Sequence, residues 1–184
     1  MSADNPAVPA VETVLRDDVR IECYVRSGVP SAVSQQISTV VDRLRTLDDR
    51  DTVADVQLDP WPSRHALTGE SSPTRDDLVA EFERWADQRG YSLEPAFRRQ
   101  QVPTSPLGLG DEQVERIRVP LLALALYGDD ERLRGVVPYT DRPQPEEGRT
   151  YTVEQWLTAA ETQAVELSLD TSSDEPTAFL RGRQ

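Results

Sequence analysis

The sequence contains no lysine, a single cysteine, Cys23, and a single histidine, His65. Without lysine there is no Gly-Lys-Ser/Thr segment, so a phosphate-binding P-loop is excluded. One thiol excludes an internal disulfide and a cysteine-rich zinc site, so we predict that Cys23 is a small buried side chain. His65 would have to serve any serine-histidine-aspartate triad or act as a pH switch. No nucleophile motif accompanies it, and we expect an exposed loop residue.

Long apolar runs are also missing from the sequence. No run reaches the length of about 18 residues that a membrane-spanning helix needs. The first residues lack the basic start and apolar middle of a signal peptide. We therefore expect a cytoplasmic protein with no membrane partner.

Acidic residues outnumber basic ones by 33 to 20, all 20 basic residues are arginine, and the net charge is −13 at pH 7. A dense carboxylate surface keeps a protein soluble, and concentrated salt screens its self-repulsion. We interpret this charge as adaptation to a salty cytoplasm and not as evidence for a basic partner. Adjacent acidic residues such as Asp48-Asp49 are accordingly interpreted as solvated surface.

Hydrophobic periodicity predicts strands and helices in alternation in the first half of the chain. Residues 20–26 alternate in polarity and predict a strand, and the apolar spacing over 33–47 predicts a helix. Residues 53–58 predict a second strand, because the prolines that follow prevent a helix. The segment 74–90 begins with a capping-box pattern and ends in glycine, which predicts a second helix.

The second half predicts a meander of strands over residues 93–102, 113–127 and 131–139. The Gly-Asp-Asp sequence between the last two predicts a turn, and hence an antiparallel hairpin. Leucine and alanine in the later part of 113–127 also favour a helix, but Pro120 and the turn favour a strand. A second capping box predicts a last helix over 152–167.

The predicted order β-α-β-α-β-β-β-α indicates an α/β protein of the α+β type. We expect a two-layer sandwich in which about three helices pack on a mixed five-stranded sheet. A single domain is predicted over residues 19–169. Disordered tails are predicted at 1–18 and 170–184, where apolar periodicity is too weak to offset the cost of ordering.

One group of charged residues could form a binding site, namely the arginines of the predicted meander. They are Arg98, Arg99, Arg116, Arg118, Arg132 and Arg134. If the hairpin keeps residue parity matched, the last four share a face with Leu122, Leu124 and Leu126. Such an arginine-rimmed apolar patch would bind an anionic ligand, a nucleic acid or an acidic partner. Cross-strand pairing with nearby glutamates is the alternative.

Both faces of the predicted strand over 113–127 are partly apolar. Either the last helix or a second copy of the chain must therefore cover the second face. The residues predicted for self-association are Leu122, Leu124, Leu126 and Val136. The glycine pair within 107–110 lacks the context of a dinucleotide loop and is interpreted as a connector. No residue is predicted to be catalytic, to bind a cofactor or to ligate a metal.

Five short segments resemble a known family in their order and spacing. They are Glu22-Cys-Tyr-Val-Arg26, Val40-Val-Asp-Arg-Leu44, Phe82-Glu-Arg-Trp85-Ala, Ser92-Leu-Glu-Pro95-Ala-Phe97 and Val137-Pro-Tyr139. This combination is similar to that of small haloarchaeal proteins labelled as containing a helix-turn-helix domain, over about residues 20–165. The resemblance implies a DNA-binding transcription regulator.

Several functions remain open at this point. The first is a non-enzymatic regulatory or interaction protein that self-associates, as a homodimer, through the sheet. The second is a DNA-binding regulator that uses the arginines of the meander, and an enzyme or small-molecule sensor is the third. The residues favour the first, because a strand is predicted where a helix-turn-helix needs a second helix directly after the first.

Overall fold

The computed structural model describes residues 19–64, 73–103, 113–141 and 148–172. The predicted amino-terminal tail, the glycine pair and His65 lie outside these ranges. Within them the chain is an α/β protein with mixed sheets, as predicted.

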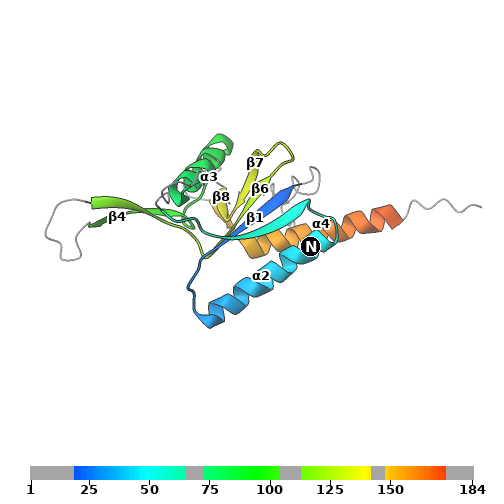
Figure 1. The fold of residues 1–184 in the computed structure, drawn as a ribbon. Helices are drawn as coiled ribbons and strands as arrows, with labels where there is room; N and C mark the ends of the chain where they lie inside the picture. Colours follow the sequence, from blue (N-terminus) through cyan, green and yellow to red (C-terminus); the bar gives the residue numbers. More distant parts are fainter. Residues whose placement is uncertain (1–18, 65–72, 104–112, 142–147, 173–184) are drawn as a thin grey trace, which may run out of the picture.

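A four-stranded sheet forms the centre of the molecule, in the order β2-β1-β6-β7 (Figure 1). β1 (Arg20–Val25) pairs in parallel with β2 (Asp55–Pro60) and antiparallel with β6 (Leu122–Tyr127). β7 (Leu133–Val137) pairs antiparallel with β6, so the predicted hairpin is confirmed. α2 (Ser31–Asp49) connects the two parallel strands, which need such a crossover.

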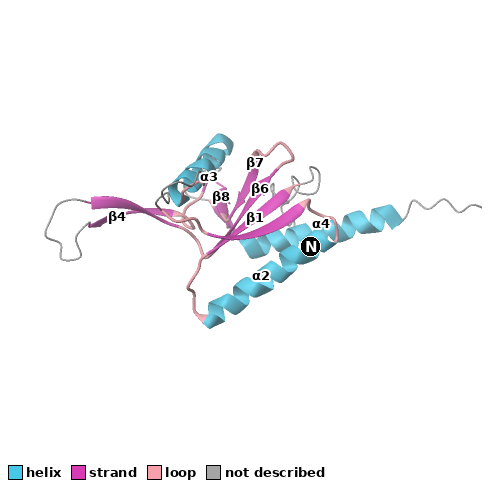
Figure 2. Ribbon diagram, viewed as in Figure 1, coloured by secondary structure: helices cyan, strands magenta, loops and turns pink. Residues whose placement is uncertain are grey.

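Helices cover both faces of this sheet (Figure 2). α2 and α4 (Val153–Ser172) lie on one face, and α3 (Arg75–Arg89) lies on the other. Tyr24 of β1 contacts Phe82 of α3, with ring centroids 6.1 Å apart. Cys23, which precedes Tyr24 in β1, is fully buried on the opposite face of the sheet. The molecule therefore has three layers where two were predicted, and α4 extends beyond the predicted domain boundary.

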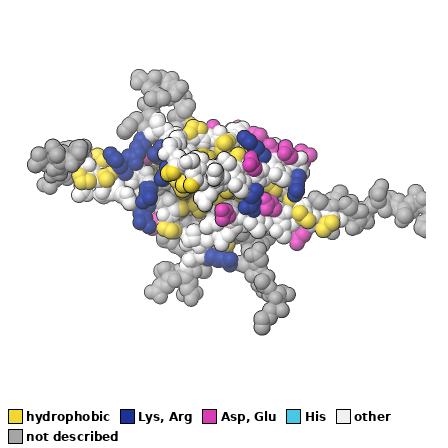
Figure 3. All heavy atoms as spheres, turned by 90° about the horizontal axis from the view of Figure 1, so that it is seen from below, with side chains coloured by type: hydrophobic (Ala, Val, Ile, Leu, Met, Phe, Trp, Pro, Cys, Tyr) yellow, Lys and Arg dark blue, Asp and Glu magenta, His cyan; other side chains and the backbone are white. Residues whose placement is uncertain are grey.

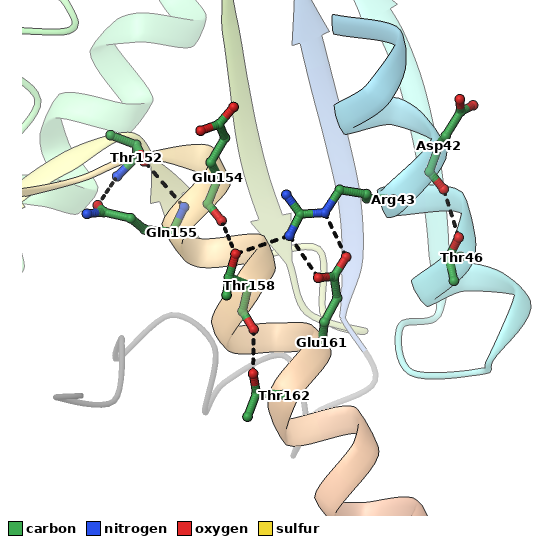
Figure 4. A network of polar contacts seen from close by, with 9 residues as sticks. All are labelled: Asp42, Arg43, Thr46, Thr152, Glu154, Gln155, Thr158, Glu161 and Thr162. Carbon is green, nitrogen blue, oxygen red and sulfur yellow. Dashed lines mark hydrogen bonds and ion pairs between the residues drawn. The ribbon is translucent and has the colours of Figure 1, made fainter. Parts of the chain in front are cut away.

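The contact between α2 and α4 includes a bidentate ion pair (Figure 4). Arg43 donates from Nε and Nη2 to the two carboxylate oxygens of Glu161, both at 2.8 Å. It also donates to Thr158 Oγ1 at 3.1 Å. Two parallel hydrogen bonds fix orientation as well as adding energy, so this pair aligns the two helices.

Both predicted capping boxes are confirmed. Thr74 Oγ1 accepts a hydrogen bond from the backbone N–H of Asp77, whose carboxylate accepts one from the backbone N–H of Thr74. Thr152 and Gln155 make the corresponding exchange at the start of α4. α3 ends at Arg89, and the C-cap residue Gly90 has a φ of 72°, a left-handed conformation that glycine adopts without strain.

The predicted strand over 113–127 is divided in two. β5 (Gln113–Arg118) pairs with β4 (Arg98–Pro103), whereas β6 belongs to the central sheet. The division falls at Pro120, which has no backbone N–H to donate to a strand neighbour. β4 and β5 form a two-stranded arm that projects from the body of the molecule (Figure 1).

The remaining strands form a third, small sheet in the order β3-β8-β9. They are β3 (Tyr91–Ser92), β8 (Tyr139–Asp141) and β9 (Arg149–Tyr151). The predicted strand over 93–102 is correct only from Arg98 onward, because β4 begins there. The strand predicted over 131–139 is divided at Pro138 between β7 and β8. In the described ranges, sheets of four, three and two strands replace the predicted single sheet of five.

Cys23 lies in the core as predicted, and its thiol is free. Burial, followed by the nearby carboxylate of Asp59, raises the pKa of this thiol to about 12. A thiol with such a pKa stays protonated at neutral pH and packs as a small apolar group.

Candidate functional site

The β4–β5 arm presents a face of arginine, glutamine and valine side chains. Its cross-strand pairs are Arg98–Arg118, Gln100–Arg116 and Val102–Val114. Opposite residues of an antiparallel pair share a face, and every second pair lies on the same face. Like charges directly opposite each other destabilise a sheet, so the pairing of Arg98 with Arg118 adds no stability to the arm.

A cavity of about 390 Å³ lies where the arm meets the body. Five arginines line it, two from the arm and three from other parts of the chain. They are Arg26, Arg64, Arg75, Arg116 and Arg118. Arg98 lines a neighbouring cavity together with Arg26 and Arg118. We call these six residues the arginine groove.

Backbone carbonyl groups hold the three arginines of the body in place. Arg26 Nη2 donates to the carbonyl oxygen of Val119, and Arg64 Nη2 donates to that of Ile117 at 3.4 Å. Arg75 Nε donates to the carbonyl oxygen of Pro62 at 3.0 Å. A carbonyl oxygen orients a guanidinium group but does not neutralise its charge. These contacts therefore present cations toward the cavity.

Among the described residues, no acidic side chain is paired with these arginines. Within the part of the chain that the structure describes, no carboxylate forms an ion pair with a member of the arginine groove. Burial, the charge of Arg64 and that of Arg26 lower the pKa of Arg75, although Asp76 acts against this shift. Arginine remains charged despite such a shift, so the crowded cations favour the binding of an anion.

Other predicted site residues are neutralised elsewhere. Arg99 lies on the opposite face of the arm, where it forms ion pairs with Glu83 at 2.6 Å and Glu115 at 3.0 Å. Arg132 lies in the turn between β6 and β7, Arg134 lies at the start of β7, and both pair with Asp130. The structure thus brings together Arg98, Arg116 and Arg118 of the six predicted arginines and separates the other three.

The predicted grouping of arginines with Leu122, Leu124 and Leu126 was wrong. It assumed one continuous strand from Gln113 to Tyr127, in which parity would carry through. The break at Pro120 places β5 and β6 in different sheets, so no common face exists.

Sequence reasoning missed Arg26, Arg64 and Arg75. Arg26 follows β1, Arg64 lies beyond β2, and Arg75 opens α3. Each looks like an ordinary surface arginine in its own segment, and only the tertiary fold gathers them. Arg64 follows Trp61, which is buried and donates from Nε1 to the carbonyl oxygen of Pro120 at 3.1 Å. That contact fixes the loop beside the arm.

The distribution of charge over one face of the molecule agrees with this picture. In Figure 3, arginine side chains gather near the base of the projecting arm, whereas acidic side chains lie mostly toward the opposite end. A chain of net charge −13 thus has a local cationic region.

The surface predicted for self-association is not available. Leu124, Leu126 and Val136 are completely buried, and Leu122 is partly buried. Helices of the same chain cover both faces of β6, so a second copy is not needed to cover it. The prediction was wrong for Leu124 and Leu126 because the last helix and α2 together shield their face. It was wrong for Val136 because this residue pairs with Ala125 on the opposite face, which α3 covers. Self-association itself stays a prediction.

The described residues contain no cluster of histidine, cysteine, aspartate or glutamate that could hold a metal ion. Among the helices that the structure describes, none combines the length and apolar character needed to cross a membrane.

A family model described as a helix-turn-helix domain matches residues 14–165. The match covers most of the chain, and the protein therefore belongs to this helix-turn-helix domain family. A comparison with curated proteins found no match. The predicted resemblance to a family with this label is confirmed, while the haloarchaeal origin stays a prediction.

The fold differs from what the family description suggests. In the described ranges, α2 is followed by β2 and α3 by β3, so no two helices are joined by a short turn. A helix-turn-helix requires that second helix to enter the major groove of DNA. A contact with DNA through the described residues would therefore not take the form of a helix-turn-helix.

Proposed function

We propose that this protein is a DNA-binding transcription regulator that contacts DNA through the arginine groove and the β4–β5 arm. The family description supports the class of function. The arginine groove supports the place of contact, because it is a set of clustered cations without acidic partners among the described residues, in an otherwise acidic chain.

The arm has dimensions that suit DNA. Each strand of the arm has six residues and is therefore roughly 20 Å long. The major groove of B-DNA is about 12 Å wide and admits a two-stranded β-ribbon. Protein families that read DNA with such ribbons are known, so a recognition helix is not required.

The side chains of the arm divide into two roles in this proposal. Arg98 and Arg118, near the body, contact phosphates together with the body arginines and set the position on DNA. Gln100 and Arg116 lie further along the arm on the same face. Glutamine and arginine are the side chains that pair with adenine and guanine edges, so these two residues are the candidates for base contacts.

The test is a double charge reversal, Arg116→Glu with Arg118→Glu. DNA affinity is measured by fluorescence anisotropy over a range of KCl concentrations in which circular dichroism shows a folded protein. We expect affinity to fall at least about tenfold, because two cations that meet DNA become anions. The slope of log affinity against log salt should shrink by about 0.9, because Arg118 is the phosphate contact of this pair and each lost phosphate contact removes about 0.9.

The matched control is Arg132→Glu, which makes the same kind of change at an arginine whose side chain is 82% exposed at the β6–β7 turn. Its DNA affinity should stay close to that of the unmodified chain. The proposal fails if the unmodified chain binds no DNA at any salt concentration, or if the double variant binds as well as the control.

A further inference from the structure

A second feature, a groove of mixed character, continues from the arginine groove along the side of the molecule. A cavity of about 340 Å³ is lined by the charged residues Arg26, Arg98 and Arg118 and by the apolar residues Pro95 and Leu121, among others. Pro95, Ala96 and Leu121 also line the next cavity, of about 520 Å³. The shared lining residues make the cavities neighbours in a single row.

The larger cavity is mainly apolar. Its walls come from the first half of α2, the start of β6 and the start of α4, through Val33, Ile37, Leu122 and Val153. Leu121, between the two cavities, is 42% exposed despite its size. Figure 1 shows that α2 begins on the side of the molecule from which the arm projects. Small-molecule sites typically have volumes of about 300–1,000 Å³ and mostly apolar walls, and this cavity lies in that range.

We propose that this row of cavities binds an amphipathic anion, a molecule with a carboxylate or phosphate head and an apolar chain. The head lies among Arg26, Arg98 and Arg118, where it neutralises the opposed arginine pair of the arm. The chain passes over Leu121 and enters the apolar cavity. The row is charged at one end and apolar at the other, so it favours a ligand that also has a charged end and an apolar end.

This site has a regulatory consequence, and that part rests on the proposed function. Arg98 and Arg118 belong to both the ligand head site and the proposed DNA contact. A bound anion would occupy the same guanidinium groups as a phosphate of DNA. The amphipathic anion would therefore release DNA from the arm.

The direct test is calorimetric titration of the full chain with decyl phosphate and with decanoate, below their micelle concentrations. Octyl phosphate measures the contribution of the chain, and decanol and inorganic phosphate represent the two halves of the ligand. We expect decyl phosphate to bind roughly 15-fold more tightly than octyl phosphate, because each of the two additional buried CH₂ groups contributes roughly fourfold. Decanol and inorganic phosphate should each bind at least about tenfold more weakly than decyl phosphate. The comparison of decanoate with decyl phosphate identifies the preferred head group.

Leu121→Asp tests the position of the site, with Val165→Asp as the matched control. Val165 is 49% exposed on α4, away from the row of cavities. Leu121→Asp should weaken decyl phosphate binding at least tenfold, while Val165→Asp should change neither decyl phosphate binding nor DNA binding. Arg116→Glu should weaken DNA binding without weakening decyl phosphate binding, because Arg116 does not line the two cavities. A failure of the DNA-binding proposal can therefore be distinguished from a failure of the ligand proposal.

The proposal is overturned if neither amphiphile binds, or if the two aspartate variants bind decyl phosphate equally well. It is also overturned if sedimentation shows a dimer that Leu121→Asp dissociates, because the apolar cavity would then be an interface between copies. Release of DNA by decyl phosphate from the unmodified chain, but not from Leu121→Asp, would support the regulatory consequence. Unchanged DNA binding in the presence of saturating decyl phosphate would overturn it.

Discussion

The β4–β5 and β6–β7 hairpins are both antiparallel, and β5 and β6 are separated only by Val119–Leu121, yet their environments are opposite. β6 is buried from Ala123 to Tyr127, between helices on both sides. β5 is exposed along its length except at Ile117. The comparison teaches that one stretch of strand-like sequence can supply both a core strand and a surface arm when a proline separates its halves.

Arginines on the two hairpins differ in the same way. The β6–β7 hairpin carries Arg132 in its turn and Arg134 at the start of β7, and Asp130 pairs with both. On the β4–β5 arm, Arg98 and Arg118 form a cross-strand pair in the arginine groove. Among the described residues, neither forms an ion pair with a carboxylate. The opposite charges of the first arrangement stabilise the folded protein. The like charges of the second destabilise it unless an anion binds. This difference is the physical basis of both proposals.

The largest effect should come from truncating a core residue of the buried hairpin. Leu124→Ala is expected to lower the free energy of unfolding by about 2–5 kcal/mol, because it leaves a cavity in a fully buried site. Val114→Ala, at a half-exposed position on the arm, should change it by no more than about 0.5 kcal/mol. Urea denaturation in molar salt measures both.

The loss caused by Leu124→Ala should not depend on protein concentration, because Leu124 is buried within one chain. A loss that grows on dilution would instead place Leu124 at an interface between copies. Equal losses for the two variants would remove the distinction between core hairpin and arm.

A smaller effect should separate paired from unpaired arginines. Arg43→Gln removes the bidentate pair with Glu161, whose two side chains are 29% and 32% exposed, and should cost no more than about 1 kcal/mol of unfolding free energy. Arg116→Gln removes a cation that has no carboxylate partner among the described residues, so stability should stay the same or rise slightly. Thermal unfolding of the two glutamine variants side by side tests this. A larger loss from Arg116→Gln would contradict the interpretation of the groove as an unbalanced cationic site.

The smallest expected effect is the change in unfolding free energy at acidic pH that depends on Glu161. Hydrogen bonding to Arg43 is the main cause of the lowered pKa of Glu161, and partial burial opposes it. A carboxyl group whose folded-state pKa is depressed contributes stability above its unfolded value, here 4.5, and loses that contribution as the pH falls through the folded value. Glu161→Gln should therefore lose less unfolding free energy than the unmodified chain as the pH is lowered below about 4.5.

The corresponding comparison is urea denaturation at pH 6 and at a series of acidic pH values, with Arg116→Gln as the control for a general loss of charge. The difference between Glu161→Gln and the unmodified chain should be a few tenths of a kcal/mol, because the pair is about one-third exposed. Parallel acid curves for all three proteins would exclude the pair as a source of acid sensitivity.

Local sequence patterns were sufficient to predict most of the helices and strands of the fold. Capping boxes at Thr74 and Thr152 predicted the starts of α3 and α4, and the Gly-Asp-Asp turn predicted the β6–β7 hairpin. These signals work because their hydrogen bonds involve residues close together in the chain. Of the candidate site, the sequence predicted Arg98, Arg116 and Arg118, which lie on one arm.

The rest of the site could not be predicted from local patterns. Arg26, Arg64 and Arg75 lie in separate segments, and the loop that contains Trp61 brings two of these segments beside the arm. Whether the halves of 113–127 shared a sheet depended on pairing with β1 and β4, which are distant in sequence. Strand pairing is decided by the burial that it achieves, and no local pattern contains that information.

The sequence by itself determined the positions of the helices, the hairpin turn, the buried cysteine and the acidic, lysine-free character of the chain, because each depends on neighbouring residues or on composition alone. Only the tertiary structure decided that one predicted strand becomes a core strand and an arm, and that six arginines form one groove. Both outcomes depend on contacts between residues far apart in the chain, whose free energy exists only once the whole molecule is folded.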